Sequence, residues 1–173
     1  MTGLDAPTDT PPTGTDASPA ALAAAVIHSL VERGETVAVA ESLTGGLLAA
    51  TLVDVAGASA AFRGGLVVYA TDLKQTLAGV PGELLAGRGP IDPDVAIALA
   101  EGTRGRCGTD WGLATTGVAG PEPQDGKPVG LVFVAVAGPT GSSARRLQLP
   151  GGRAAVRSGT ITAVLHLLVD QLR

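Results

Sequence analysis

The sequence predicts an α/β fold, a three-layer α/β/α sandwich around a mainly parallel, mixed β-sheet. Short apolar runs, typical of strands covered on both faces, alternate along the chain with amphipathic helical runs. Towards the C-terminal end, two strand-like runs flank a Gly-Pro-Thr-Gly turn, which predicts one antiparallel hairpin. Of the 173 residues, 45% are hydrophobic and only 16% are charged, so the chain can bury a sizeable core.

The folded domain is expected to span residues 18–173. Residues 1–17 are rich in Thr, Pro, Asp and Gly and offer little to bury, so we expect a disordered N-terminal tail there. Ser18 followed by Pro19 predicts the start of the first helix, because serine caps helices and proline suits the first helical position. Gly34 predicts its end.

The next elements are two predicted strands, each followed by a predicted helix. Residues 36–40 are almost entirely apolar and predict a buried strand, and a helix is expected over 47–53 after a glycine-rich turn. A second strand is predicted over 66–69, followed by a short helix from residue 71. The remaining predicted elements are a helix from Asp92-Pro93 to about 106, a strand over 111–116, a loop over 117–128, hairpin strands over 130–137 and 144–149, and a helix over 153–172.

Composition excludes several classes of protein. With 12 Lys+Arg against 16 Asp+Glu, the net charge is −4, and the basic surface that a nucleic-acid-binding protein needs is missing. The single cysteine, Cys107, cannot form an internal disulfide, and no apolar run approaches the roughly 18 residues of a membrane span. The N-terminal residues lack a signal-peptide pattern. We therefore expect a cytoplasmic protein that binds neither nucleic acid nor membranes.

Three polar clusters, at residues 41–46, 69–74 and 115–121, fall at the carboxyl ends of predicted strands, where open α/β sheets bind ligands. Ser42 would lie near the unpaired N–H groups of a helix start, which can hold a phosphate or an oxyanion. Gly45 and Gly46 would let a ligand approach the backbone. The alternative is that Ser42 or Thr44 is an ordinary helix cap and the glycines serve only packing.

Other candidates are ambiguous when taken one at a time. Tyr69 and Lys74 are five residues apart, not the four of a Tyr-x-x-x-Lys dehydrogenase pair, and they could equally be a core aromatic and a solvated lysine. The segment 120–127 has the wrong spacing for a phosphate-binding Walker loop. Arg153 and Arg157 could grip a phosphate at a helix start or form a solvated face.

No metal site is predicted. His28 and His166 lie within helical runs and have no second ligand at metal spacing, and Cys107 has no histidine near it in the sequence. We expect Cys107 to be a small apolar filler. No organic cofactor is predicted either.

Taken together, the polar clusters resemble the CinA C-terminal domain family. The resemblance rests on four ordered blocks and covers residues 20–172. The blocks are Glu41-Ser42-Leu43-Thr44-Gly45-Gly46-Leu47, Gly65-Leu66-Val67-Val68-Tyr69 with Lys74, Thr116-Gly117-Val118-Ala119-Gly120-Pro121, and Lys127-Pro128-Val129-Gly130. Two positions depart from the family pattern: Ile91-Asp92 replaces Val-Ser, and Gly151-Gly152-Arg153 replaces Gly-Asp-Arg.

The resemblance implies an amidohydrolase that converts nicotinamide mononucleotide to nicotinic acid mononucleotide and ammonia. It implies Ser42 as the nucleophile, with Tyr69 and Lys74 assisting it, and Thr116 as part of the site. Tyr69 could relay the proton or orient the lysine. Since no histidine is placed to activate the serine, Lys74 would be the base, which requires a lowered pKa. Expected substrate-binding groups are Thr44, Gly45, Gly46, Thr116, Gly117, Arg153 and Arg157.

The resemblance further implies a stand-alone domain, a small-molecule nucleotide substrate and a homo-oligomer. Two alternatives stay open: a catalytically silent nucleotide-binding module, and an amidase acting on another small amide. The role of Glu41 is also open. It could take part in the chemistry, or its charge could simply be satisfied by nearby backbone N–H groups.

Overall fold

The computed structural model describes residues 17–173. Except for Ala17, the expected N-terminal tail lies outside the described residues. No helix among residues 17–173 is both long enough and apolar enough to cross a membrane. The elements are α1 (Pro19–Arg33), β1 (Val37–Glu41), α2 (Leu47–Val53), η1 (Ala58–Ala60), β2 (Phe62–Val67), α3 (Thr71–Thr76), α4 (Gly82–Arg88), α5 (Pro93–Cys107), β3 (Trp111–Gly117), β4 (Leu131–Gly138), β5 (Gly141–Gln148) and α6 (Arg153–Gln171).

The five strands form one mixed sheet in the order β2-β1-β3-β4-β5. Strand β1 is parallel to both β2 and β3, whereas β4 is antiparallel to β3 and to β5. The carboxyl ends of β1, β2 and β3 therefore lie at the same edge of the sheet. The predicted α/β sandwich with a mixed sheet and a C-terminal hairpin is confirmed.

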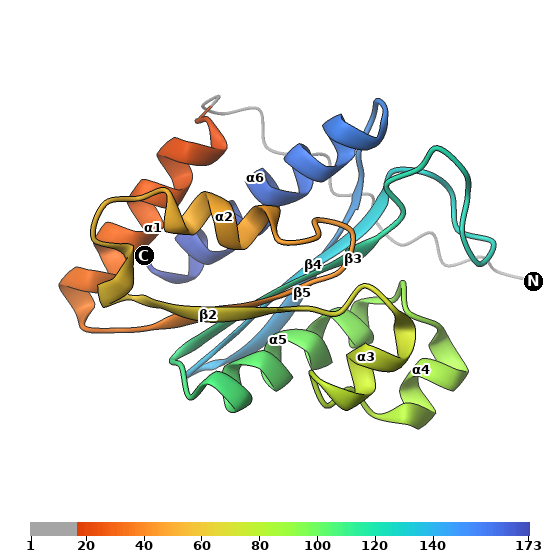
Figure 1. Ribbon diagram of the computed structural model, residues 1–173, viewed down its shortest axis with the longest axis horizontal. Coiled ribbons are helices and arrows are strands. Elements are labelled where there is room, and N and C mark those ends of the chain that lie inside the picture. Colours follow the sequence, from red (N-terminus) through yellow and green to blue (C-terminus); the bar gives the residue numbers. More distant parts are fainter. Residues whose placement is uncertain (1–16) are drawn as a thin grey trace, which may run out of the picture.

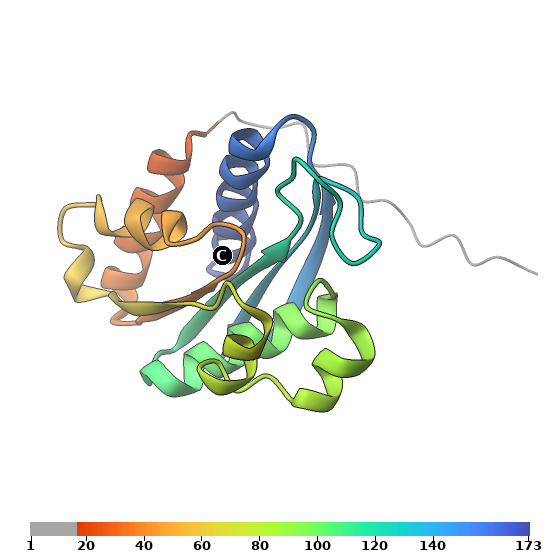
Figure 2. The ribbon, with the colours of Figure 1, turned by 45° about the vertical axis from the view of Figure 1, so that its right-hand side comes forward.

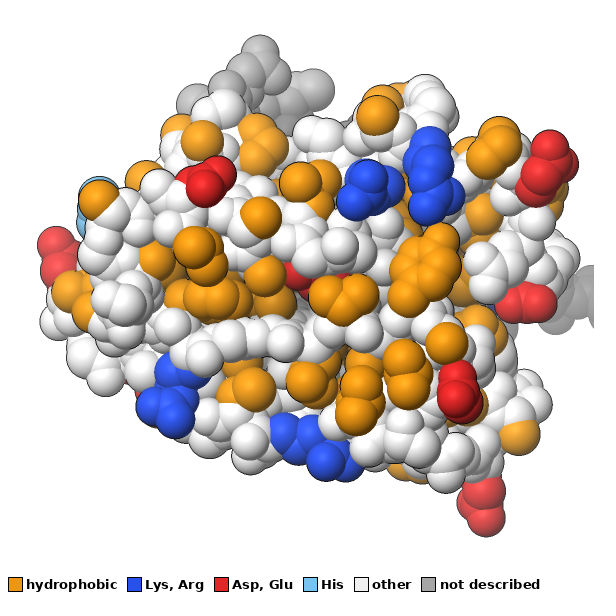
Figure 3. All heavy atoms as spheres, viewed as in Figure 1, with side chains coloured by type: hydrophobic (Ala, Val, Ile, Leu, Met, Phe, Trp, Pro, Cys, Tyr) orange, Lys and Arg blue, Asp and Glu red, His pale blue; other side chains and the backbone are white. Residues whose placement is uncertain are grey.

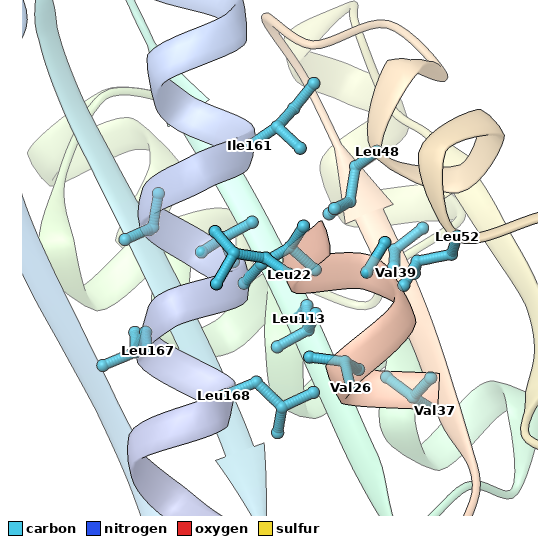
Figure 4. Packing of buried hydrophobic residues seen from close by; sticks show 14 of the residues in the cluster. Leu22, Val26, Val37, Val39, Leu48, Leu52, Leu113, Ile161, Leu167 and Leu168 are labelled. Carbon is cyan, nitrogen blue, oxygen red and sulfur yellow. The ribbon is translucent and has the colours of Figure 1, made fainter. Parts of the chain in front are cut away.

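Helices cover both faces of this sheet. Figure 1 shows α1, α2 and α6 on one face and α3, α4 and α5 on the other, and the turned view of Figure 2 separates the same three layers. The first face buries a cluster that includes Leu22, Val39, Leu113 and Leu168, seen close up in Figure 4. A second cluster lies between α5 and the opposite face. Because both faces are covered, β1, β3 and β4 are almost wholly buried.

Helices α1 and α5 begin and end where the sequence predicts. Ser18 accepts a hydrogen bond from the N–H of Ala21 at 3.2 Å, and Gly34 closes α1 in the left-handed conformation. Asp92 accepts from the N–H of Asp94 at 2.9 Å and caps α5. Local capping chemistry therefore fixes these boundaries.

Strand β2 is where the sequence prediction is wrong. It spans Phe62–Val67 instead of 66–69, so Tyr69 lies beyond the strand, in the connection to α3. The Arg-Gly-Gly segment has low strand propensity, but pairing with β1 overrides it. A side chain on Gly65 would come within 2.5 Å of Val39, so glycine is required for the two strands to approach.

Helix α4 and the short 3-10 helix η1 were not predicted. Residues 82–88 contain two glycines and follow Pro81, and only Leu85 of α4 is buried. The apolar periodicity that indicates a helix is therefore weak in this segment.

Candidate active site

The three polar clusters meet in one pocket at the carboxyl ends of the parallel strands. The pocket has a volume of about 110 Å³. It is lined by residues from each cluster, from the start of α6 and from two further loops: Ser42, Leu43, Tyr69, Thr71, Lys74, Pro90, Ile91, Thr116, Gly117, Val118, Ala119, Gly120, Glu122, Gln124 and Arg153. Segments more than 100 residues apart in the chain thus build a single site.

A buried lysine lies against a serine at the base of this pocket. Lys74, the fourth residue of α3, is only 1% exposed, and its Nζ donates to Ser42 Oγ at 3.0 Å. The same Nζ donates to the backbone carbonyls of Val68 at 2.8 Å and Tyr69 at 3.4 Å. These contacts account for all three protons of an ammonium group.

Burial changes the acidity of this lysine. Desolvation lowers the pKa of Lys74 from 10.5 to about 8. A neutral amine keeps two N–H donors and gains a lone pair, so the bonds to the two carbonyls can persist while the Ser42 hydroxyl donates to Nζ. The geometry therefore suits both protonation states, and in the neutral state Lys74 can accept a proton from Ser42.

Glu41 explains how the turn after β1 is built. Its buried carboxylate accepts three backbone N–H groups at the start of α2: those of Gly46 at 3.1 Å, Leu48 at 3.0 Å and Ala49 at 2.8 Å. The carboxylate thus caps α2, whose cap residue Gly46 has no side chain to do so. Of the two roles considered for Glu41, the structure shows the one in which backbone N–H groups satisfy its charge.

Strand β3 also holds the turn of residues 42–46, called the serine turn here. The N–H of Ser42 donates to the carbonyl of Thr115 at 3.1 Å, and the hydroxyls of Thr44 and Thr115 lie 2.8 Å apart. Thr44 is fully buried, so its side chain anchors the turn and does not line the pocket.

The backbone N–H groups of this turn are not equally available. The N–H of Gly45 donates to the carbonyl of Ser42 at 3.1 Å, and that of Gly46 is taken by Glu41. The N–H groups of Leu43 and Thr44 donate to no group among residues 17–173. Leu43 lines the pocket and Thr44 does not, so a donor for an anion bound beside Ser42 can come from Leu43.

Tyr69 and Arg153 lie together at the pocket mouth. Nη2 of Arg153 donates to the Tyr69 hydroxyl at 3.2 Å, and its Nη1 donates to the carbonyl of Gly120 at 2.8 Å. Tyr69 is 60% exposed, and its hydrogen bond with the buried lysine is made by its backbone carbonyl. Apart from Lys74, Arg153 is the only basic residue among those that line the pocket.

The structure brings six of the predicted site residues to the pocket: Ser42, Tyr69, Lys74, Thr116, Gly117 and Arg153. The Thr116 hydroxyl donates to the carbonyl of Pro90 at 2.6 Å, which fixes a pocket wall. Thr44, Gly45 and Gly46 belong to the serine turn and do not line the pocket. Arg157 contacts this turn and does not line the pocket either. Arg157 instead donates to the carbonyls of Leu43 at 3.0 Å and Thr44 at 2.7 Å.

Sequence reasoning missed the far wall of the pocket, which includes Ile91, Glu122 and Gln124. Ile91 follows α4, which was not predicted, and the other two lie in the long loop before β4. The motif blocks at Thr116–Pro121 and Lys127–Gly130 flank this segment and indicate that the loop contributes to a site, but neither block includes Glu122 or Gln124.

Outside the pocket, the remaining candidates are separate from one another. His28 lies on α1 and His166 on α6, and Cys107 is the last residue of α5, half-buried beside Thr103. Within the described part of the chain, no three His, Cys, Asp or Glu side chains gather closely enough to hold a metal ion.

Fold and site together define an α/β protein with a buried lysine–serine pair where its parallel strands end. Residues 19–172 match the model of the CinA C-terminal domain. The chain belongs to this family, which confirms the resemblance inferred from its motifs.

Relatives and solved structures agree with this membership. A CinA-like protein of Frankia casuarinae is 51% identical over 143 residues, which are 83% of this chain and 33% of that protein. A CinA-like protein of Geobacter sulfurreducens is 49% identical over 86% of this chain and 35% of its own length. The chain thus spans about a third of the length of these curated relatives.

Among solved structures, the competence/damage inducible protein CihA from Agrobacterium tumefaciens has a TM-score of 0.86 at 33% identity, over 90% of this chain and 96% of that one. A competence-damaged protein (CinA) superfamily protein from Enterobacter cloacae has a TM-score of 0.89 at 26% identity, over 99% and 100%.

Proposed function

We propose that this protein hydrolyses the carboxamide of nicotinamide mononucleotide, giving nicotinic acid mononucleotide and ammonia. The observation that carries the proposal is the 3.0 Å contact between Ser42 Oγ and the Nζ of a lysine that is 1% exposed. A serine hydroxyl needs a base to become a nucleophile, and this lysine has a pKa lowered to about 8. The choice of substrate rests on membership of the CinA family and on the motif blocks that resemble its amidohydrolases.

In the first half of the reaction, Ser42 Oγ attacks the carboxamide carbon while Nζ of neutral Lys74 takes the hydroxyl proton. The carbonyl oxygen becomes an oxyanion, which the N–H group of Leu43 stabilises. The tetrahedral intermediate then collapses. The C–N bond breaks, the amine leaves with the proton from Lys74 as ammonia, and an ester on Ser42 remains.

In the second half, water attacks the ester carbon and gives a proton to Lys74. The C–O bond to Ser42 breaks, and Lys74 returns that proton to Ser42 Oγ. The acid product loses its proton to solvent and leaves as a carboxylate. Each step uses only the substrate, water and the side chains present, so the scheme calls for no cofactor.

The pocket is sized for the reacting end of the substrate. A cavity of about 110 Å³ is smaller than the roughly 300–1,000 Å³ of pockets that enclose a whole drug-sized ligand. We place the carboxamide-bearing ring inside and the ribose and phosphate at the mouth. There the guanidinium of Arg153 is the group suited to bind a phosphate.

Tyr69 takes two parts in this proposal. Its backbone carbonyl, together with that of Val68, orients Nζ of Lys74 towards Ser42. Its exposed ring and hydroxyl, bonded to Arg153, form the wall that the nucleotide meets on entry. In this proposal Tyr69 orients Lys74 and does not relay the proton.

The test is ammonia release from nicotinamide mononucleotide by the purified protein. We expect turnover by the wild type, loss of at least about a thousandfold in Ser42→Ala and Lys74→Met, and poor turnover of nicotinamide riboside, which lacks the phosphate. Equal turnover of the riboside would indicate an amidase with another substrate. Binding of the mononucleotide without ammonia release would indicate a silent binding module and would overturn the catalytic proposal.

A further inference from the structure

We propose that Arg157 is a positioning residue that orients the oxyanion-binding peptide group beside Ser42, and that it does not bind substrate. This inference rests on the proposed serine chemistry at the same site. It concerns a residue of α6, more than a hundred residues from the turn that it contacts.

The contacts of Arg157 all go to the serine turn. Its Nε donates to the carbonyl of Leu43 at 3.0 Å and its Nη2 to that of Thr44 at 2.7 Å. No carboxylate among residues 17–173 forms an ion pair with it. The guanidinium, which is rigid and presents parallel donors, thus fixes two successive peptide planes.

Because a peptide group is planar, a contact that holds its carbonyl also fixes the direction of its N–H. The C=O and N–H of a trans peptide point in opposite directions, and the carbonyl of Thr44 shares its plane with the N–H of Gly45. By holding that carbonyl, Arg157 directs the Gly45 N–H, which donates to the Ser42 carbonyl at 3.1 Å. The Ser42 carbonyl in turn shares its plane with the N–H of Leu43, so Arg157 sets where that N–H points.

The N–H group so oriented lacks a partner. Leu43 is only 4% exposed and lines the pocket, yet its N–H donates to no group among the described residues. Buried N–H groups without partners are rare in folded proteins, so this one indicates a place for an acceptor that arrives with the reaction. The other N–H groups of the turn region, at Gly45, Gly46, Leu48 and Ala49, are already bonded within the protein.

The first test is steady-state ammonia release by Arg157→Met. Since loss of one oxyanion donor costs about 10²–10³ in kcat, we expect misorientation of the donor to lower kcat by about 10- to 100-fold. KM should stay within about twofold, because Arg157 does not line the pocket. The apparent pKa of the rate profile should not move, because Lys74 is untouched.

A matched control is Arg145→Met. Arg145 lies on β5 and pairs with Asp170 at 3.5 Å, away from the pocket, so its loss should leave kcat and KM unchanged. Addition of methylguanidine to Arg157→Ala should restore part of the lost kcat, which a merely unfolded variant would not allow.

A second readout separates this inference from the choice of substrate. Phenylmethanesulfonyl fluoride sulfonylates an activated serine: the Oγ–S bond forms, fluoride leaves, and the proton passes to Lys74. Mass spectrometry of the peptide containing Ser42 should show labelling of the wild type that is at least about tenfold slower in Arg157→Met. If the wild type is labelled but leaves nicotinamide mononucleotide intact, the proposed substrate fails while the role of Arg157 is still measured.

Two results would overturn the inference. One is a folded Arg157→Met protein with wild-type kcat and wild-type labelling rate. The other is a raised KM with unchanged kcat, which would make Arg157 a substrate-binding residue, as the sequence alone suggested.

Discussion

Lys74 is the residue on which the site depends, and its chemistry follows from where α3 places it. The side chain reaches back under the carboxyl ends of β1 and β2, where two backbone carbonyls and Ser42 replace the water it has lost. Desolvation then lowers its pKa to about 8, close to the value a base needs near neutral pH.

This lowered pKa predicts the pH dependence of the reaction. Lys74 must be neutral to accept the Ser42 proton, so kcat/KM should rise about tenfold per pH unit below about pH 8 and level off above it. Measurements of kcat/KM between pH 6 and 9.5 would check this. Lys127→Met, which changes the only other lysine, should leave the profile unchanged, whereas a flat wild-type profile would exclude Lys74 as the base.

The same shift predicts how stability depends on pH. The folded pKa of Lys74 lies below its unfolded value, so the unfolded chain binds more protons between about pH 8 and 10.5, and stability rises with pH in that window. Relative to Lys74→Met, the wild type should gain about 2 kcal/mol between pH 7 and 9.5. Urea unfolding of both proteins at the two pH values measures the gain; a constant difference would contradict the lowered pKa.

At the scale of residues, the sequence revealed the identity of the site but not its contacts. Ser42, Tyr69 and Lys74 were predicted from motif blocks, because polar residues after apolar runs are visible in a sequence. That Arg157 faces backbone carbonyls and Arg153 faces the pocket could not be predicted. Both follow Gly151-Gly152 on one helix, and only the packing of α6 separates their roles.

At the scale of elements, the starts of five helices were predictable with or without a side-chain cap, namely α1, α2, α3, α5 and α6, whereas α4 and η1 were not predicted. Ser18 and Asp92 are side-chain N-caps that predict the starts of α1 and α5, whereas α2 is capped by Glu41 from the preceding strand. The prediction misplaced strand β2 because the Arg-Gly-Gly segment has low strand propensity. The pairing with β1 that makes this segment a strand is a tertiary contact, which local propensity does not reveal.

The cap that Glu41 provides can be tested by Glu41→Gln. The amide keeps one acceptor oxygen but turns an NH₂ group towards backbone donors, so we expect a loss of about 2 kcal/mol in the free energy of unfolding. Urea denaturation measures this loss. The exposed Glu32→Gln on α1 is the matched control and should change stability by less than about 0.5 kcal/mol. Equal stability of the two variants would contradict the capping role.

At the scale of the whole molecule, one edge of the sheet is apolar and unpaired. Among residues 17–173, β2 pairs only with β1. Five of the six large hydrophobic side chains that are exposed lie on β2 or on the segments beside it: Leu47, Val53, Val67, Tyr69 and Leu77. Figure 3 shows hydrophobic side chains on both sides of this edge. Exposed edge strands are templates for pairing with another chain.

We therefore expect a homo-oligomer in which β2 of one copy pairs antiparallel with β2 of another. A two-fold axis makes such an edge self-complementary, and Gly64 and Gly65 leave the approach unobstructed. Light scattering after size exclusion should give at least twice the chain mass of 17.0 kDa, and Val67→Asp should reduce it to one chain. Val31→Asp, on α1, should behave as the wild type. A monomeric wild type, or dissociation by Val31→Asp alone, would contradict this arrangement.

In the proposed reaction, Ser42 forms a covalent ester during hydrolysis of nicotinamide mononucleotide. Mass spectrometry of protein quenched in acid during turnover, beside Ser42→Ala, detects this ester directly. We expect the peptide containing Ser42 to gain the mass of the acid product less water, and the variant to gain nothing and release no ammonia. Ammonia release by Ser42→Ala at the wild-type rate would contradict the proposed reaction.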